Sequence, residues 1–166
     1  YVHLGTNVRK YHAGGHAYRS VSGSPFATVK PNGSVIGPTI NTSPTSHTPI
    51  PFSELGKAAY IKIYPGMDIV SICNGIDSSK TGAIVVELYP SFTGPTGENG
   101  LPQLAAWAQA RGIVVFGCTA EPSEINLKPY ESTVSAENSG IIYLPKIAPE
   151  VAYVRASLAG DQSGAQ

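Results

Sequence analysis

The chain has 166 residues, 42% of them hydrophobic, which is enough for one main core and a small additional part. Lysine and arginine together number 11, as do aspartate and glutamate, so the sequence lacks the basic surplus that nucleic-acid or anionic-membrane binding needs. Its longest apolar runs fall far short of the roughly 20 residues that cross a bilayer. The sequence therefore predicts a soluble protein with neither a nucleic-acid nor a membrane partner.

The first part of the chain reads as strands and turns. Residues 1–36 begin with a strand-like YVHL, pass through the basic stretch TNVRKYHAGGHAYRS and end in a predicted hairpin at residues 25–36. Asn32-Gly33 suits a two-residue hairpin turn, because both positions of such a turn need a positive φ, which Asn tolerates and Gly permits. Residues 37–53 are rich in Pro, Ser and Thr, and proline disfavours both a helix and a central strand, so we expect an extended linker.

Residues 54–160 read as one α/β domain. The stretch AAYIKIYPG alternates like a strand, while AIVVELYP and GIVVFGC are the nearly continuous β-branched runs of parallel strands covered on both faces. Between the latter two, Leu101, Leu104, Ala105 and Ala108 show the spacing of a crossover helix that ends before Gly112.

A short strand, IIYL, and a closing helix in APEVAYVRASLAG follow, the latter with Val151, Val154, Arg155 and Leu158 at helical spacing. This order predicts a Rossmann-like or flavodoxin-like α/β sandwich with a mostly parallel sheet. We expect residues 161–166 to form a flexible tail.

The cysteines and histidines indicate neither a disulfide scaffold nor a metal centre. Cys73 and Cys118 lack the C-x-x-C spacing of a zinc site, and we expect buried free thiols. His12 and His16 have the i, i+4 spacing of helical metal ligands, but the glycine pair between them disfavours a helix. No metal is predicted.

Three polar residues are candidates for chemistry, each with an ordinary alternative. Lys10 could shuttle protons if burial lowered its pKa, or it could be a surface lysine. Asn99 lies in the glycine-rich loop GPTGENG between a strand and a helix, where ligands of α/β sheets collect, but the loop matches no nucleotide motif and could simply be solvated. Glu131 belongs to an acidic segment that could meet a substrate amine or could serve solubility.

Several stretches in collinear order resemble one known family. NVRK, AYRS, PFATV and PNGSV, then AAYIKIYPGMD, TGAIVVELY, LPQLAAWAQARGIVVFGCT and INLKPYESTVSAENSGIIYLPKIAPEVAYVRASL are similar to the second half of L-asparaginases, and most of all to the cytoplasmic type I branch. The likeness covers nearly the whole chain. It implies that residues 1–36 are the tail of an N-terminal domain and that residues 54–160 are the C-terminal α/β domain.

The resemblance also implies a chemistry. In this family a threonine nucleophile in a G-G-T-I turn attacks the side-chain amide of asparagine, or of glutamine, with the help of a G-T-D-T motif and a lysine. Lys10 matches that lysine, Asn99 a substrate-contacting asparagine, and Glu131 an acidic residue offered to the substrate by a neighbouring protomer. The likeness implies a cytoplasmic homo-oligomer without a cofactor.

The family's threonine motifs are absent from this sequence. We therefore expect the isolated chain to be inactive and to need a missing N-terminal catalytic half as its partner, and the initial Tyr1 in place of Met agrees with a processed product or a fragment. The alternative is a non-catalytic domain that binds a small ligand or assembles subunits. The sequence leaves open the preference between asparagine and glutamine and the oligomeric state.

Overall fold

The body of the protein is a parallel sheet. The computed structural model describes residues 1–21, 24–38, 57–120 and 130–159. Four parallel strands pair in the order β5-β6-β7-β8: β5 (Ala58–Lys62), β6 (Ala83–Leu88), β7 (Val114–Thr119) and β8 (Ile142–Tyr143). The predicted α/β class with a mostly parallel sheet is confirmed.

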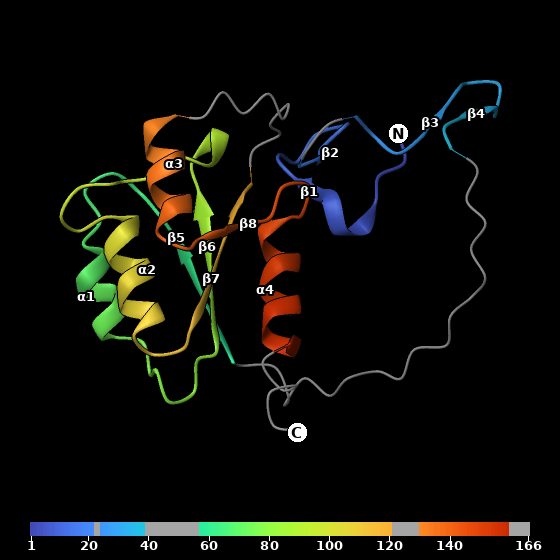
Figure 1. The fold of residues 1–166 in the computed structure, drawn as a ribbon. Coiled ribbons are helices and arrows are strands. Elements are labelled where there is room, and N and C mark those ends of the chain that lie inside the picture. Colours follow the sequence, from blue (N-terminus) through green and yellow to red (C-terminus); the bar gives the residue numbers. More distant parts are fainter. Residues whose placement is uncertain (22–23, 39–56, 121–129, 160–166) are drawn as a thin grey trace.

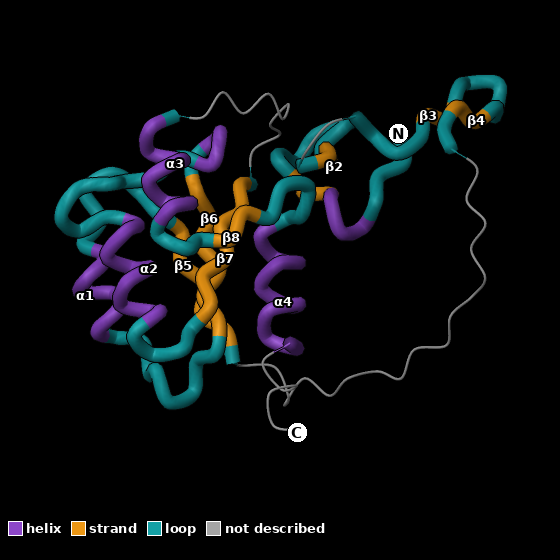
Figure 2. Tube along the Cα trace, viewed as in Figure 1, coloured by secondary structure: helices purple, strands orange, loops and turns teal. Residues whose placement is uncertain are grey.

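Helices cover both faces of this sheet. Three lie on one face: α1 (Ile69–Asn74), α2 (Leu101–Gln109) and α3 (Glu131–Asn138). On the other face lies α4 (Pro149–Ala159), so in Figures 1 and 2 the strands stand between three helices on one side and one on the other. No helix among the described residues is both long and apolar enough to traverse a bilayer.

The crossover helix forms where the spacing predicts it. Leu101, Leu104, Ala105 and Ala108 are all buried in α2, against the sheet and α1. Gly100 is the N-cap, Pro102 occupies the first turn and Ala110 is the C-cap; the turn that follows contains Gly112, whose φ of +69° suits glycine. Hydrophobic periodicity therefore determines both the position and the buried face of this helix.

The closing helix is present as α4, but the face that it buries is not the one indicated by the helical spacing of Val151, Val154, Arg155 and Leu158. Its buried residues are Pro149, Ala152, Ala156 and Ser157, whereas Val154 is 43% exposed and Arg155 is exposed. Small side chains at the interface let α4 approach β6 and β5 closely, so alanine and serine rather than the larger valines face the sheet.

The N-terminal part contains two small antiparallel ribbons. The first pairs β1 (Val8–Lys10) with β2 (Tyr18–Ser20), and the second pairs β3 (Thr28–Val29) with β4 (Val35–Ile36). The strand-like start of the sequence makes only an isolated bridge, from Val2 to Ala27, and is followed by a 3₁₀ turn at Gly5–Asn7.

The hairpin at residues 25–36 is confirmed, but its turn differs from the prediction. Lys30 N–H donates to the Ser34 carbonyl and Gly33 N–H to the Lys30 carbonyl, so three residues form the loop. Gly33 has a φ of +81°, while Asn32 is not among the residues with positive φ. Pro31 explains the difference, because its fixed φ suits the first central position of a type I turn.

The segments outside these strands and helices include a second 3₁₀ turn, the predicted linker and the predicted tail. A second 3₁₀ turn, Pro90–Phe92, follows β6 and carries Ser91 and Phe92 at positive φ. The predicted linker lies almost entirely outside the described residues, as does the predicted tail at 161–166. The domain boundaries therefore remain predictions.

Candidate functional site

Lys10 lies at the end of β1 rather than after a strand. It pairs with Tyr18 across the ribbon, and its ammonium is 6.0 Å from the centroid of the Tyr18 ring. The side chain is exposed. Arg9 precedes it in the strand and reaches the α/β body, so the alternation of a strand directs Lys10 to the opposite face of the ribbon.

Asn99 and Glu131 lie at the starts of α2 and α3, the helices on the face of the sheet opposite to α4. Asn99 is exposed in the loop that leads into α2, directly before the N-cap Gly100. Glu131 is the first residue of α3 and is also exposed. Within the described residues, no hydrogen bond or ion pair joins Lys10, Asn99 and Glu131 to one another, and their roles remain predictions.

A cluster that the sequence reasoning missed lies at the carboxyl end of β6. Glu87 is only 5% exposed, although it is charged and belongs to a strand whose residues are all buried. Its carboxylate accepts hydrogen bonds from the Tyr60 hydroxyl and from the Lys62 ammonium, the latter at 2.8 Å. Arg9 and Glu150 complete this group, which we call the Glu87 cluster.

Arg9 connects the N-terminal ribbon to the cluster. Its Nη1 atom is 3.5 Å from Oε1 of Glu87 on β6, and its Nε atom is 2.9 Å from Oε1 of Glu150 in the first turn of α4. The Arg9 side chain is 27% exposed and that of Glu150 56%, so the contact to Glu150 lies closer to solvent than that to Glu87.

The charges of the cluster determine its protonation. Burial acts to raise the pKa of Glu87, but hydrogen bonds from Lys62 and Tyr60, with the positive charges of Arg9 and Lys62, leave that pKa below its usual value. Burial, with the hydrogen bond to Glu87, raises the pKa of Tyr60. Glu87 is therefore ionised at neutral pH and Tyr60 stays a donor, so the cluster is a set of satisfied charges rather than a free general base.

The cluster borders an open pocket of about 440 Å³, whose wall also includes Tyr153 and Val154 of α4. The rings of Tyr60 and Tyr153 meet edge to face at 6.2 Å between centroids. The pocket lies where β5 and β6 end, which is the edge of a parallel sheet where ligands usually bind.

One sequence signal could have identified this cluster. AIVVELY places a glutamate inside an otherwise apolar, β-branched strand, and a charged residue is buried only when it has partners. Tyr60 and Lys62 lie at alternate positions of β5 and so on the same face of the sheet as Glu87. Arg9 could not be predicted from this pattern, because it comes from a distant ribbon.

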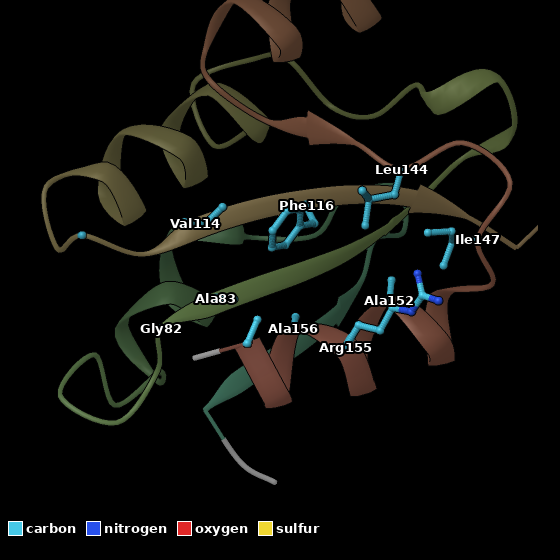
Figure 3. Close-up of a pocket in the computed structure, with 11 residues that line it drawn as sticks. Gly82, Ala83, Val114, Phe116, Leu144, Ile147, Ala152, Arg155 and Ala156 are labelled. Carbon is cyan, nitrogen blue, oxygen red and sulfur yellow. The ribbon is translucent and has the colours of Figure 1, made fainter. Parts of the chain in front are cut away.

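A second pocket, of about 480 Å³, contains none of the candidate residues (Figure 3). It lies between α4 and the sheet, where Phe116 and Leu144 face the small side chains of Ala152 and Ala156. Arg155 is the charged residue among the described residues that line it. α4 packs most extensively on β6, and the pocket lies beside that contact, against β7 and the segment that follows β8.

The thiols and histidines of the described residues show no reactive arrangement. Cys73 and Cys118 are buried and free, as predicted, and burial together with Glu87 and Glu150 raises the pKa of Cys118 to about 12. His12 accepts a hydrogen bond from the N–H of Gly14 within its own turn. No group of three or more His, Cys, Asp or Glu side chains in the described ranges could hold a metal ion.

Comparison with curated proteins finds relatives of one kind, although no family model matches the chain. The chain is 30% identical over 157 residues to a glutamyl-tRNA(Gln) amidotransferase subunit from Pyrococcus horikoshii. It is 27% identical to the corresponding protein from Pyrococcus abyssi. The match takes in 93% of this chain but 35% of the P. horikoshii protein, so the chain spans about a third of the length of these relatives.

Solved structures show the same fold. An L-asparaginase I from Vibrio cholerae superposes with a TM-score of 0.67 and 22% identity, over 96% of this chain and 48% of its own. The thermostable L-asparaginase from Thermococcus kodakarensis superposes with a TM-score of 0.65 and 25% identity, over 95% of this chain and 47% of its own. The resemblance seen in the sequence is confirmed: the chain has the L-asparaginase fold over a stretch that corresponds to about half of such a protein.

Proposed function

We propose that the chain is the C-terminal part of an L-asparaginase-type amidohydrolase, which hydrolyses the side-chain amide of L-asparagine, or of L-glutamine, to the acid and ammonia. The observation that carries this proposal is the extent of the likeness to the T. kodakarensis L-asparaginase. It takes in 95% of this chain but only 47% of the other protein. The catalytic threonines then belong to the half that these 166 residues do not include.

Lys10 is the proposed proton-relay residue of this chemistry. It corresponds to the lysine of the asparaginase pattern, and its exposed side chain extends from the face of β1 opposite to Arg9. A threonine of the other half would attack the amide carbon, backbone N–H groups would stabilise the oxyanion, and ammonia would leave before water releases the acid. Lys10 would carry the proton between the attacking hydroxyl and its surroundings.

Asn99 and Glu131 have less support and are proposed as substrate contacts only. Both are exposed, on the loop before α2 and at the start of α3, where they could reach a substrate held by a neighbouring protomer. The proposal thus includes a homo-oligomer. It also includes a cytoplasmic location, which the type I resemblance and the free thiols of Cys73 and Cys118 support.

Ammonia release tests the proposal directly. The 166-residue chain is assayed with asparagine and with glutamine, alone and after mixing with the polypeptide encoded upstream of Tyr1. We expect release only from the mixture, because the chain alone lacks a nucleophile. Release by neither sample, with binding of the amino acid retained, would favour the alternative of a non-catalytic ligand-binding or assembly domain. Exposed apolar side chains of the N-terminal part, Tyr1, Val35 and Ile36, would be available for contacts in that alternative.

A further inference from the structure

Within the described residues, the β1 strand and the residues that flank it contact the α/β body before, within and after the strand. Just before it, the carbonyl of Thr6 accepts a hydrogen bond from the Ala148 N–H at 3.1 Å. Just after it, the Tyr11 hydroxyl donates to the carbonyl of Ala120, the residue that follows β7. Between these points, Arg9 is the residue of β1 that makes ion pairs with the body.

Arg9 bridges carboxylates from two different elements. Glu87 belongs to β6 and Glu150 to α4, and the guanidinium makes an ion pair with each. A guanidinium is planar and its N–H groups form a fixed fork, so two carboxylates restrain both its position and its rotation. Glu87 is itself immobilised, because its side chain is 6% exposed and also binds Tyr60 and Lys62.

We propose that Glu87 and Glu150 clamp Arg9 and thereby set the position of the Lys10 ammonium. Glu87 is then a positioning residue for the amide hydrolysis, and the inference rests on the proposed function because it takes Lys10 as the relay. Adjacent strand residues point to opposite faces, so Arg9 anchors β1 on the side of the body while Lys10 serves the other side. The α/β half would thus contribute to catalysis through the placement of the lysine.

The ribbon depends on this anchor more than a larger sheet would. β1 and β2 form a two-stranded sheet, and an isolated two-stranded ribbon is only marginally stable in water. Its pairing includes the hydrogen bond from the Tyr11 N–H to the Ala17 carbonyl at 2.8 Å and that from Val21 N–H to the Asn7 carbonyl, also at 2.8 Å. Loss of the clamp should therefore increase local opening at these amides.

Amide hydrogen exchange in the 166-residue chain tests the clamp without any need for activity. Arg9→Met and Glu150→Gln should speed exchange at Tyr11 and Val21 by about tenfold or more, while amides in β6 and β7 keep the wild-type rate. Lys80→Met is the matched control. Lys80 forms an ion pair with Asp77 at 2.9 Å, and neither residue belongs to the Glu87 cluster, so its loss should leave the ribbon's exchange unchanged.

Steady-state ammonia release by the chain joined to its upstream segment tests whether Arg9 and Glu87 position Lys10. Displacement of a catalytic group by about 1 Å can lower a rate about 100-fold, so Arg9→Met and Glu87→Gln should each reduce kcat by up to that factor. KM should stay unchanged, because the cluster is not proposed to touch the substrate. Arg9→Lys, which keeps the charge, should recover part of kcat, and the double variant Arg9→Met with Glu87→Gln should be no slower than either single one.

The outcomes distinguish a failure of the Arg9 clamp from a failure of the proposed amidohydrolase function on which its catalytic role rests. Unchanged exchange at Tyr11 in Arg9→Met would show that no clamp operates, and this variant stays informative even if Glu87→Gln does not fold, because the Arg9 side chain is 27% exposed. Faster exchange with an unchanged kcat would overturn the positioning role. If the joined protein released no ammonia at all, the proposed function and the catalytic role of the clamp would both be rejected, and the exchange data would still decide whether Arg9 anchors the ribbon.

Discussion

Arg9 and Glu87 link the N-terminal ribbon to the centre of the parallel sheet, with Nη1 of the arginine 3.5 Å from Oε1 of the glutamate. One partner is on a two-stranded ribbon and the other on a fully buried strand. Tyr60 and Lys62 of the α/β body already bind the Glu87 carboxylate and hold it in place. Arg9 adds a further contact to this ionised group. This contact makes the stability of the ribbon depend on an ionised Glu87.

The stability that Glu87 supplies should depend on pH. Its pKa in the folded protein lies below the ordinary value of 4.5, so its contribution is complete above pH 4.5 and declines as the pH falls through the lower, folded-state pKa. Glu87→Gln should cost about 2 kcal/mol in the free energy of unfolding at pH 7, since it removes a charged acceptor from its donors.

Urea unfolding of both proteins between pH 7 and pH 2 measures this difference. The gap between wild type and Glu87→Gln should shrink below pH 4.5. The comparison within this pair matters, because Asp77, with a pKa lowered to about 2 by its bonds to Ser79 and Lys80, loses its own contribution at acid pH in both proteins. A gap of constant size across the whole range would contradict the account of Glu87.

The glycine-rich loop before α2 should tolerate substitution at one glycine and not at another. A Cβ on Gly100 would collide with the backbone carbonyl of Pro95, and it would lie 2.9 Å from that of Gly97. We expect Gly100→Ala to destabilise the protein by about 2 kcal/mol. Gly97→Ala is the control, since nothing lies within 4 Å of its added Cβ, and it should change stability by less than about 0.5 kcal/mol.

Thermal unfolding of these two alanine variants gives the test. A loss at Gly100 with none at Gly97 would show that Gly100 is required for the close turn that carries Asn99 into α2. Equal losses would indicate that the loop closes differently from the arrangement described above.

The buried face of α2 should carry much of the stability of the body. Leu104 is 0% exposed within the main core, and Leu104→Ala should cost about 3 kcal/mol because it leaves a cavity between α2 and the sheet. Leu4, which is 48% exposed, provides a leucine-to-alanine control with an expected cost below about 0.5 kcal/mol. Chemical unfolding monitored by circular dichroism distinguishes the two, and a cost at Leu104 no larger than at Leu4 would contradict the packing of α2.

The sequence predicted the parts of the fold that depend on a strong hydrophobic period. β6 is an apolar run interrupted by Glu87 alone, and α2 repeats its apolar residues every three or four positions, so both could be located. α3 escaped prediction because it has little apolar character, with only Thr133 and Ala136 buried. The prediction of which face of α4 is buried was wrong, because small residues pack against the sheet while Val154 stays exposed.

The candidate site was less predictable, because it depends on residues far apart in the chain. Lys10 was a candidate proton carrier from the sequence, and only the resemblance gives it the role of the relay lysine, which remains a prediction. The partner that anchors its strand, Glu87, was visible only as a glutamate in an apolar run. Their connection through Arg9 follows from the way the ribbon packs on the carboxyl edge of the sheet, and a single sequence carries no direct signal of such packing.

The central claim is that this chain lacks the nucleophile of an asparaginase and supplies the relay lysine. The most direct measurement is ammonia release from asparagine by four proteins: the chain alone, the chain joined to its upstream segment, the joined protein with Lys10→Met, and, as control, the joined protein with a change at the exposed Lys30, Lys30→Met. We predict release only from the joined protein and from its Lys30→Met variant, with an unchanged melting curve for Lys10→Met. Release by the chain alone, or a full rate in Lys10→Met, would contradict the claim.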